Sequence, residues 1–195
     1  MVVNILIASV GGQGGHTLAR VLAYAAVLEG YNVRVGESLG MSQRYGSVKS
    51  FVRLGNEVRS PTFGYNEANY LIGLELLESL RNVHYLRLDG KALVASVLKP
   101  PFMSRDDYLR LRKEDVILRL KHVLRDNLVI VDADEAIKRV GNPRTLNMVL
   151  LGAFLSASNL LSIRVASEAV IHVLPSKYVE DSLKALKTGY LLMRR

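Results

Sequence analysis

Two different hydrophobic patterns follow one another at the start of the chain. Residues 2–8 are apolar apart from Asn4, and four of them are β-branched, which predicts a strand that is buried on both faces of a parallel sheet. From Leu18 to Leu28 apolar residues recur at near-helical spacing, and Gly30 ends the pattern, which predicts a helix. Residues 11–15, which join the two, contain four glycines.

The same alternation of strand and helix patterns continues along the chain. The expected strands are 32–36, 47–54, 70–74, 92–98 and 128–132, and the expected helices are 75–85, one that begins near Lys113, 146–157 and one that begins at Ser176. A turn is expected at Asp89-Gly90. The sequence therefore predicts a single α/β domain over residues 1–195, with a Rossmann-like, doubly wound, mostly parallel sheet and a helical C-terminal third.

The glycine turn at residues 11–15 is typical of a phosphate-binding or nucleotide-binding loop. Glycine allows positive φ and leaves no Cβ in the way, so amide groups at the start of the following helix can face an anion. The dinucleotide fingerprint G-x-G-x-x-G is matched only in part, because Ser9 takes its first position. Glu37 stands where a ribose-binding acid would be, so a free-standing NAD(P)- or flavin-binding oxidoreductase is the alternative. In a third interpretation the glycines only allow close strand–helix packing.

A second segment of interest, residues 37–47, follows the second expected strand. It is polar, contains Gln43 and Arg44, and is longer than a compact domain needs. Ligands of open α/β sheets lie beyond the carboxyl ends of the strands, so this segment and the glycine turn could line one crevice. The alternative is an ordered hairpin connection in which Arg44 is solvated.

The composition excludes several kinds of chemistry. The chain has no cysteine, so disulfides, thiolate-held iron–sulfur clusters, Cys-type zinc sites and Cys nucleophiles are impossible in it. Its four histidines lack metal-binding spacing, and the G-x-S-x-G, Walker A and H-E-x-x-H motifs do not occur. Asp132 and Asp134 could contact a metal or a ribose, but Asp134 could equally cap the helix that follows. This pattern is typical of a chain that binds and positions while another chain reacts.

The net charge of +8 favours an acidic ligand or an acidic partner. The densest charged segment, residues 105–125, alternates in sign and lacks interleaved aromatic residues, so we do not expect nucleic-acid binding. No apolar stretch approaches the roughly 20 residues that span a bilayer, and the N-terminus has no basic leader. We therefore expect a cytoplasmic protein without membrane association.

Three motifs occur together in one order, V-G-G-Q-G at 10–14, G-M-S-Q-R-Y-G-S-V at 40–48 and G-N-P-R-T-L-N-M-V-L-L-G at 141–152. In this arrangement the chain resembles the gamma-type subunits of 2-oxoacid:acceptor oxidoreductases, whose substrates include pyruvate, ketoisovalerate and indolepyruvate. It is most similar to the beta subunits of indolepyruvate:ferredoxin oxidoreductases. The similarity extends over nearly the whole chain, including residues 73–78 and 183–190.

The resemblance implies an enzyme complex that oxidatively decarboxylates a 2-oxoacid, such as an aryl pyruvate, to an acyl-CoA and passes the electrons to ferredoxin. It implies that thiamine diphosphate (TPP) and iron–sulfur clusters lie on a cysteine-rich alpha-type partner subunit, with coenzyme A (CoA) as co-substrate. This chain would bind no cofactor by itself, would complete the active-site or CoA region, and would be inactive alone. It would join a hetero-oligomer, and it could form a homodimer when isolated.

The resemblance also implies a set of ligand-binding residues, while no catalytic residue and no metal ligand is assigned to this chain. The residues that match family motifs are Gly11, Gly12, Gln13, Gly14, Gln43, Arg44, Gly46, Ser47 and Asn147. The planar guanidinium group of Arg44 would suit a phosphate or a carboxylate. Tyr45 replaces a family glycine, and its ring would narrow the crevice beside Arg44 or stack on a ligand.

Overall fold

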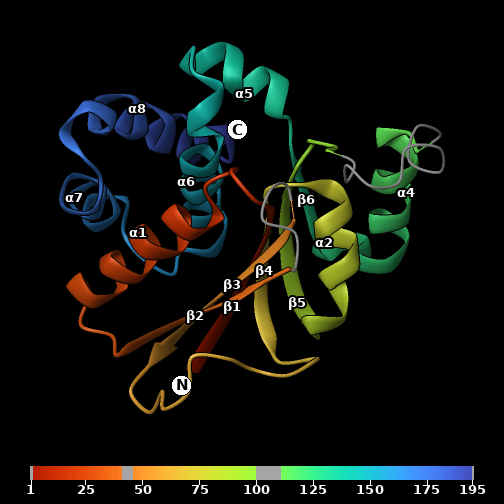
Figure 1. The fold of residues 1–195 in the computed structure, drawn as a ribbon, viewed down its shortest axis with the longest axis horizontal. Helices are drawn as coiled ribbons and strands as arrows, with labels where there is room; N and C mark the ends of the chain where they lie inside the picture. The colour runs from red at the N-terminus through yellow and green to blue at the C-terminus, as the bar shows by residue number, and fades with distance from the viewer. Residues whose placement is uncertain (1, 41–45, 100–110, 195) are drawn as a thin grey trace.

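The computed structural model describes residues 2–40, 46–99 and 111–194, which are built around a six-stranded sheet (Figure 1). The strands are β1 (Val2–Val10), β2 (Val33–Leu39), β3 (Ser47–Gly55), β4 (Ala68–Gly73), β5 (Leu86–Ala95) and β6 (Leu128–Val131). They lie side by side in the order β2-β3-β1-β4-β5-β6. β1, β4, β5 and β6 form a parallel block, whereas β3 is antiparallel to both β1 and β2. The expected mostly parallel α/β sheet is confirmed.

Helices cover both faces of this sheet (Figure 1), as in a doubly wound fold. One face carries α1 (Gly15–Leu28), α6 (Leu146–Ser158), α7 (Ile163–Val173) and α8 (Ser176–Leu192), and the other carries α2 (Leu76–Asn82) and α4 (Lys113–Leu124). The helix α5 (Ala133–Val140) leads from β6 through the 3₁₀ helix η3 (Pro143–Thr145) into α6, and η1 (Val83–Tyr85) and η2 (Arg125–Asn127) follow α2 and α4. None of the described helices combines the length and the apolar character that crossing a membrane requires.

The hydrophobic core has two parts, one on each face of the sheet. Successive residues of β1 alternate between them: Ile5 and Ile7 pack with residues of α1 and α6, whereas Leu6 and Ala8 pack with residues of α2 and α4. All four side chains are fully buried. Burial on both faces explains why this part of β1 is continuously apolar.

The helices α6 and α8 approach each other closely at two glycines. A Cβ atom on Gly152 would overlap the backbone carbonyl of Leu186, and a Cβ atom on Gly189 would overlap that of Val149. Backbone therefore packs against backbone at both points. This contact fixes the position of α6 and of the residues at its N-terminus.

The connection between β2 and β3 differs from the long loop that the sequence predicts. Residues 37–39 continue β2 and pair with β3 as far as Leu39 and Val48, because the antiparallel partner offers free backbone groups along this whole length. The N–H of Gly40 then donates to the carbonyl of Ser47 (2.8 Å). Up to these residues the connection is a hairpin, and residues 41–45 lie outside the described part of the chain.

The prediction of a turn at Asp89-Gly90 is also wrong, because both residues lie inside β5. The parallel register with β4 shifts between the pair Ala68–Leu86 and the pair Tyr70–Lys91. β5 therefore accommodates its extra residues as a bulge. Asp89 pairs with Arg87 at the surface.

Candidate functional site

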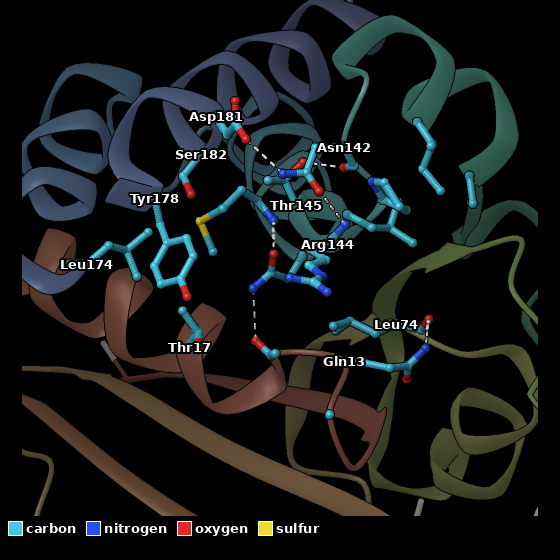
Figure 2. A pocket seen from close by; sticks show the side chains of 18 of the residues that line it. Gln13, Thr17, Leu74, Asn142, Arg144, Thr145, Leu174, Tyr178, Asp181 and Ser182 are labelled. Carbon is cyan, nitrogen blue, oxygen red and sulfur yellow. Dashed lines mark hydrogen bonds between the residues drawn. The ribbon is translucent and has the colours of Figure 1, made fainter. Parts of the chain in front are cut away.

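The carboxyl end of the parallel strands opens into a cavity of about 950 Å³ (Figure 2). Its walls come from the glycine turn and α1, from the segments that follow β4 and β5, from α5, and from the starts of η3, α6 and α8. Ligands of open α/β sheets bind at this edge of the sheet. The cavity is therefore the candidate site.

The glycines of the turn permit close packing at one position and line the cavity at others. Gly14 lies directly before α1 with φ 82°, a conformation that favours glycine. A Cβ atom there would also lie 2.5 Å from Nδ2 of Asn147. Gly15 lies against Ser9, whose Oγ occupies the space that a Cβ on Gly15 would need. Gly15 thus allows close strand–helix packing, while Gly12 and Gly14 line the cavity.

The side-chain amide of Gln13 is bonded to the backbone at the cavity wall. Its Oε1 accepts a hydrogen bond from the N–H of Val10 (2.8 Å), and its Nε2 donates to the carbonyl of Leu74 (3.2 Å; Figure 2). Gln13 therefore joins the end of β1 to the end of β4. Sequence reasoning treated it as a ligand contact, and the structure shows that it also holds the turn in place.

Asn147 connects the glycine turn to α6. Its Nδ2 donates to the carbonyl of Gly14 (3.2 Å), and its Oδ1 accepts from the N–H of Met148 (2.9 Å). The Gly14 carbonyl also accepts from the N–H of Leu18 (3.0 Å), so two donors fix this peptide group. Because C=O and N–H point in opposite directions in a trans peptide, the same bonds fix the direction of the N–H of Gly15.

The cavity is positively charged. Its lining contains the cations Arg20, Lys99, Arg144 and Lys177. None of the four forms an ion pair with a described residue. The lining also contains two carboxylates, Asp134, which pairs with Lys113, and Asp181, which accepts a hydrogen bond from the neutral amide of Asn142, so cations outnumber carboxylates in the lining. This excess of cations creates a positive potential that favours an anionic ligand.

Two long helices begin at the cavity without a side-chain cap. α1 has 14 residues and α8 has 17, and neither has a side chain that accepts from its first N–H groups or an acidic residue in its first turn. The first N–H groups of a helix lack intrahelical acceptors and form the positive end of the helix dipole. Both helix N-termini therefore add to the positive potential.

One wall of the cavity is apolar and aromatic. Val173, Leu174 and Pro175 lie at the junction of α7 and α8, next to the ring of Tyr178, which is 51% exposed. Figure 2 shows this ring extending from α8 toward Thr17 on α1. A flat apolar group could pack on this wall while phosphates meet the cations.

The segment 37–47, which the sequence marked as a possible wall of the site, contacts the glycine turn through its last residues, 46 and 47. The N–H of Gly11 donates to the carbonyl of Gly46 (2.9 Å), and Ser47 pairs with Val10 in the sheet. Gly11 belongs to the turn, and Gly46 and Ser47 adjoin it, but none of the three is among the residues that line the cavity. Gln43 and Arg44 lie outside the described residues.

Glu37, the residue on which the dinucleotide alternative depends, is bonded elsewhere. Its Oε1 lies 2.5 Å from Nδ1 of His16 and accepts from Oγ of Ser50 (3.2 Å). In the dinucleotide fold the strand that carries the acid neighbours the first strand, whereas here β3 separates β2 from β1. The carboxylate of Glu37 is not part of the cavity lining. The NAD(P)- or flavin-binding alternative therefore lacks, in this cavity, the acid that would bind a ribose.

Asp132, and not Asp134, caps α5. Oδ1 of Asp132 accepts from the N–H groups of Asp134 (3.0 Å) and Glu135 (3.1 Å). The helix begins at Ala133, earlier than the sequence pattern indicated, so the preceding aspartate takes the capping position. Within the described residues, no group of three or more His, Asp or Glu could hold a metal ion.

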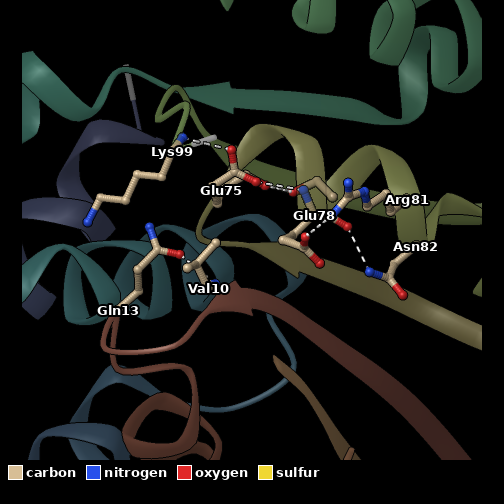
Figure 3. A network of polar contacts seen from close by, with 8 residues as sticks. Val10, Gln13, Glu75, Glu78, Arg81, Asn82 and Lys99 are labelled. Atoms are coloured by element: carbon tan, nitrogen blue, oxygen red, sulfur yellow. Dashed lines mark hydrogen bonds and ion pairs between the residues drawn. The ribbon is translucent and has the colours of Figure 1, made fainter. Parts of the chain in front are cut away.

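A buried polar network adjoins the cavity (Figure 3). The fully buried carboxylate of Glu75 caps α2, with its Oε2 accepting from the N–H of Glu78 (2.6 Å) and its Oε1 accepting from the N–H of Lys99 (3.0 Å). Burial raises the pKa of Glu75 above its ordinary value, although these bonds oppose the shift.

Sequence reasoning missed the cations and Tyr178. Arg144 lies inside a family motif and Lys99 follows an expected strand, so position at a strand end or in a motif could have indicated them. Arg20, Lys177 and Tyr178 lie on helices that only the tertiary fold brings together. No local pattern marks them.

Comparison with known proteins gives a consistent result. The model of the pyruvate ferredoxin/flavodoxin oxidoreductase family matches residues 4–192. The indolepyruvate oxidoreductase subunit IorB of Pyrococcus horikoshii is 34% identical over 190 residues, which cover 95% of this chain and 93% of the relative. The common subunit gamma of the pyruvate/ketoisovalerate oxidoreductases of Pyrococcus furiosus is 30% identical over 184 residues, which cover 92% and 91% of the two chains.

A solved structure shares the fold. It is 2-oxoglutarate:ferredoxin oxidoreductase from Magnetococcus marinus with 2-oxoglutarate, coenzyme A and succinyl-CoA bound. The match has a TM-score of 0.72 at 15% sequence identity and covers 99% of this chain and 31% of the longer one.

Proposed function

The chain belongs to the pyruvate ferredoxin/flavodoxin oxidoreductase family as a subunit of a 2-oxoacid:ferredoxin oxidoreductase, and we propose that it completes the CoA-binding and active-site region of a complex that oxidises indolepyruvate or a related aryl pyruvate. In this reaction the 2-oxoacid loses CO₂, its acyl group is joined to the thiol of CoA, and the two electrons released reduce ferredoxin. The chain alone would have no such activity.

The observation that carries this proposal is the positive cavity at the glycine turn. CoA carries a diphosphate and a 3′-phosphate, which are complementary to the excess of cations in the lining and to the uncapped starts of α1 and α8. Its adenine ring would pack on the wall that holds Tyr178. The Magnetococcus marinus enzyme, 31% of whose chain matches this fold, has CoA bound, which supports CoA as a ligand of the complex.

We assign the redox chemistry to another subunit. The chain has no cysteine, and thiolates are the usual ligands of iron–sulfur clusters. It also lacks the G-D-G…N-N pattern of TPP sites. A cysteine-rich alpha-type subunit would carry TPP and the clusters in a cytoplasmic hetero-oligomer, and ferredoxin would dock on that assembly.

The choice of indolepyruvate rests on the family motifs and on the named relatives. The relative named for indolepyruvate is 34% identical to this chain, and the relative named for pyruvate and ketoisovalerate is 30% identical. Because the two values are close, the substrate has to be decided by kinetics.

Co-expression with the alpha-type partner tests the function. We expect the complex to reduce ferredoxin only when both a 2-oxoacid and CoA are present, with a higher kcat/KM for indolepyruvate than for pyruvate or ketoisovalerate. Higher efficiency on pyruvate would contradict the substrate assignment. Turnover that does not depend on CoA, or stoichiometric NAD or flavin binding by the isolated chain, would contradict the proposed function.

Arg144→Ala tests the cavity within the same complex. Losing one charged contact to phosphate should raise KM for CoA by about tenfold or more, with a smaller change in kcat. The matched control is Arg164→Ala, which removes an exposed arginine on α7 outside the cavity and should leave KM unchanged. Equal effects of the two substitutions would contradict the location of the site.

A further inference from the structure

Glu75 is a fully buried carboxylate next to a cavity of opposite charge. Burying a carboxylate is unfavourable unless hydrogen bonds compensate for the lost water. Here the compensation comes from the backbone N–H groups of Glu78 and Lys99, each of which donates to a different oxygen. One of these bonds stays within α2, and the other reaches a residue that lines the cavity.

Lys99 lies beyond the end of β5, where no sheet ladder holds the chain. The start of α2 holds this segment at two points. The N–H of Leu76 donates to the carbonyl of Val97 (2.8 Å), and Oε1 of Glu75 accepts from the N–H of Lys99 (3.0 Å). Val97 and Lys99 both line the cavity. The Glu75 carboxylate therefore holds the backbone of Lys99 itself, beyond the point where backbone bonds hold Val97.

The same junction of β4 and α2 also holds the glycine turn. The carbonyl of Leu74, the residue before Glu75, accepts from Nε2 of Gln13 (3.2 Å). Figure 3 shows the side chain of Lys99 extending on the side of the network where Gln13 lies. One short segment thus orients a cation and the glycine turn relative to each other.

We propose that Glu75 is a positioning residue of the anion cavity, which holds the backbone of Lys99 so that its ammonium group faces a diphosphate at the glycine turn. Only the identity of the ligand, CoA, rests on the proposed function. The positioning role applies to any diphosphate in this cavity.

The chain offers a matched control on the same helix. Glu78 is also buried (4% exposed), but its Oε1 accepts from Arg81 (2.8 Å) and its side chain is bonded to no residue of the cavity lining. Glu75→Gln keeps the size of the side chain but leaves one acceptor oxygen for two backbone donors. Glu78→Gln makes the same chemical change without touching Lys99.

Calorimetric titration of the full chain with inorganic pyrophosphate is the test. Lys99→Ala should weaken binding about tenfold, and Glu75→Gln about fivefold, because it misplaces the same cation. The double variant should bind no more weakly than Lys99→Ala, and Glu78→Gln should bind as the wild type does. Pyrophosphate binding that Glu75→Gln leaves unchanged, or effects of Glu75→Gln and Lys99→Ala that multiply, would overturn the proposal.

A second measurement needs no variant. The amide proton of Lys99 in the wild-type chain should exchange slowly with solvent, because the buried carboxylate accepts it. Exchange at the rate of a free amide would overturn the proposal even if Glu75→Gln fails to fold. A wild-type chain that binds no pyrophosphate would overturn it as well, whereas binding of pyrophosphate without binding of CoA would overturn only the proposed function.

Discussion

Glu75 joins the stability of the fold to the geometry of the cavity. It caps α2 and accepts from the N–H of Lys99, and its carboxylate is shielded from water. Burial disfavours the charged form more than the hydrogen bonds from backbone N–H groups favour it, and the neighbouring Glu78 acts in the same direction as burial, so the pKa of Glu75 is raised. The ionisation state of this residue therefore contributes to stability in a pH-dependent way.

The direction of this dependence can be predicted. When the pKa of a carboxyl group is higher in the folded chain than in the unfolded chain, its contribution to stability is complete below the unfolded value, here about 4.5, and is lost as the pH rises through the folded value. Glutamine does not titrate. The free energy of unfolding of the wild type should therefore fall relative to that of Glu75→Gln as the pH rises from 4.5 toward neutrality.

Urea unfolding of both proteins at a series of pH values measures this difference. If the difference in free energy of unfolding between the wild type and Glu75→Gln does not change with pH, the carboxyl group titrates alike in the folded and the unfolded chain. A difference that grows in favour of the wild type with rising pH would show that its pKa is lowered on folding. Either result contradicts the account of Glu75.

At the residue scale, the sequence pointed to residues that line the cavity but did not reveal the hydrogen bonds that their side chains form. Gln13 and Asn147 were predicted as ligand contacts, and both line the cavity. Their amide groups, however, hold the backbone of Val10, Leu74 and Gly14. A motif shows that a position is constrained, whereas the partner of a side chain depends on residues distant in the sequence.

At the scale of elements, the local hydrophobic period located several strands and helices but not all of their boundaries. The strand β1 and the helices α1 and α6 lie where continuous apolar runs and helical spacing predict them. The extension of β2 through Glu37–Leu39 and the bulge at Asp89-Gly90 were missed. Both depend on pairing with a neighbouring strand, which a local window of sequence does not contain.

Among the packing contacts, we expect disruption of the contact between α6 and α8 to lower the stability of the fold most. Gly152→Ala would place a Cβ atom against the backbone carbonyl of Leu186, which cannot move aside as a side chain can. We expect a loss of about 1–3 kcal/mol in the free energy of unfolding, measured by urea denaturation.

Gly64→Ala is the control for this prediction. A Cβ atom on Gly64 would contact only the side chain of Glu67, with Oε1 at 3.4 Å and Cδ at 3.7 Å, which are ordinary contacts with a flexible side chain. Its effect should stay within about 0.5 kcal/mol. If Gly152→Ala were tolerated equally well, α6 and α8 would not be packed backbone to backbone.

At the scale of the whole molecule, the α/β class, the doubly wound layers and the position of a site at the carboxyl edge could be predicted from the order of elements. The strand order β2-β3-β1-β4-β5-β6 could not, because it depends on non-local pairing. The residues that line the cavity could not be predicted either. Its cations come from α1, from the segment after β5, from η3 and from α8, and only the folded chain brings these together.

The central claim is that this cavity binds the anionic part of CoA. An NMR titration of the isotope-labelled chain with CoA tests it most directly, because every backbone amide is followed separately. We expect saturable shifts at Gly12–Gly15 and at the starts of α6 and α8, with the amides of α4 unchanged. An absence of shifts, or shifts confined to elements away from the glycine turn, would contradict it.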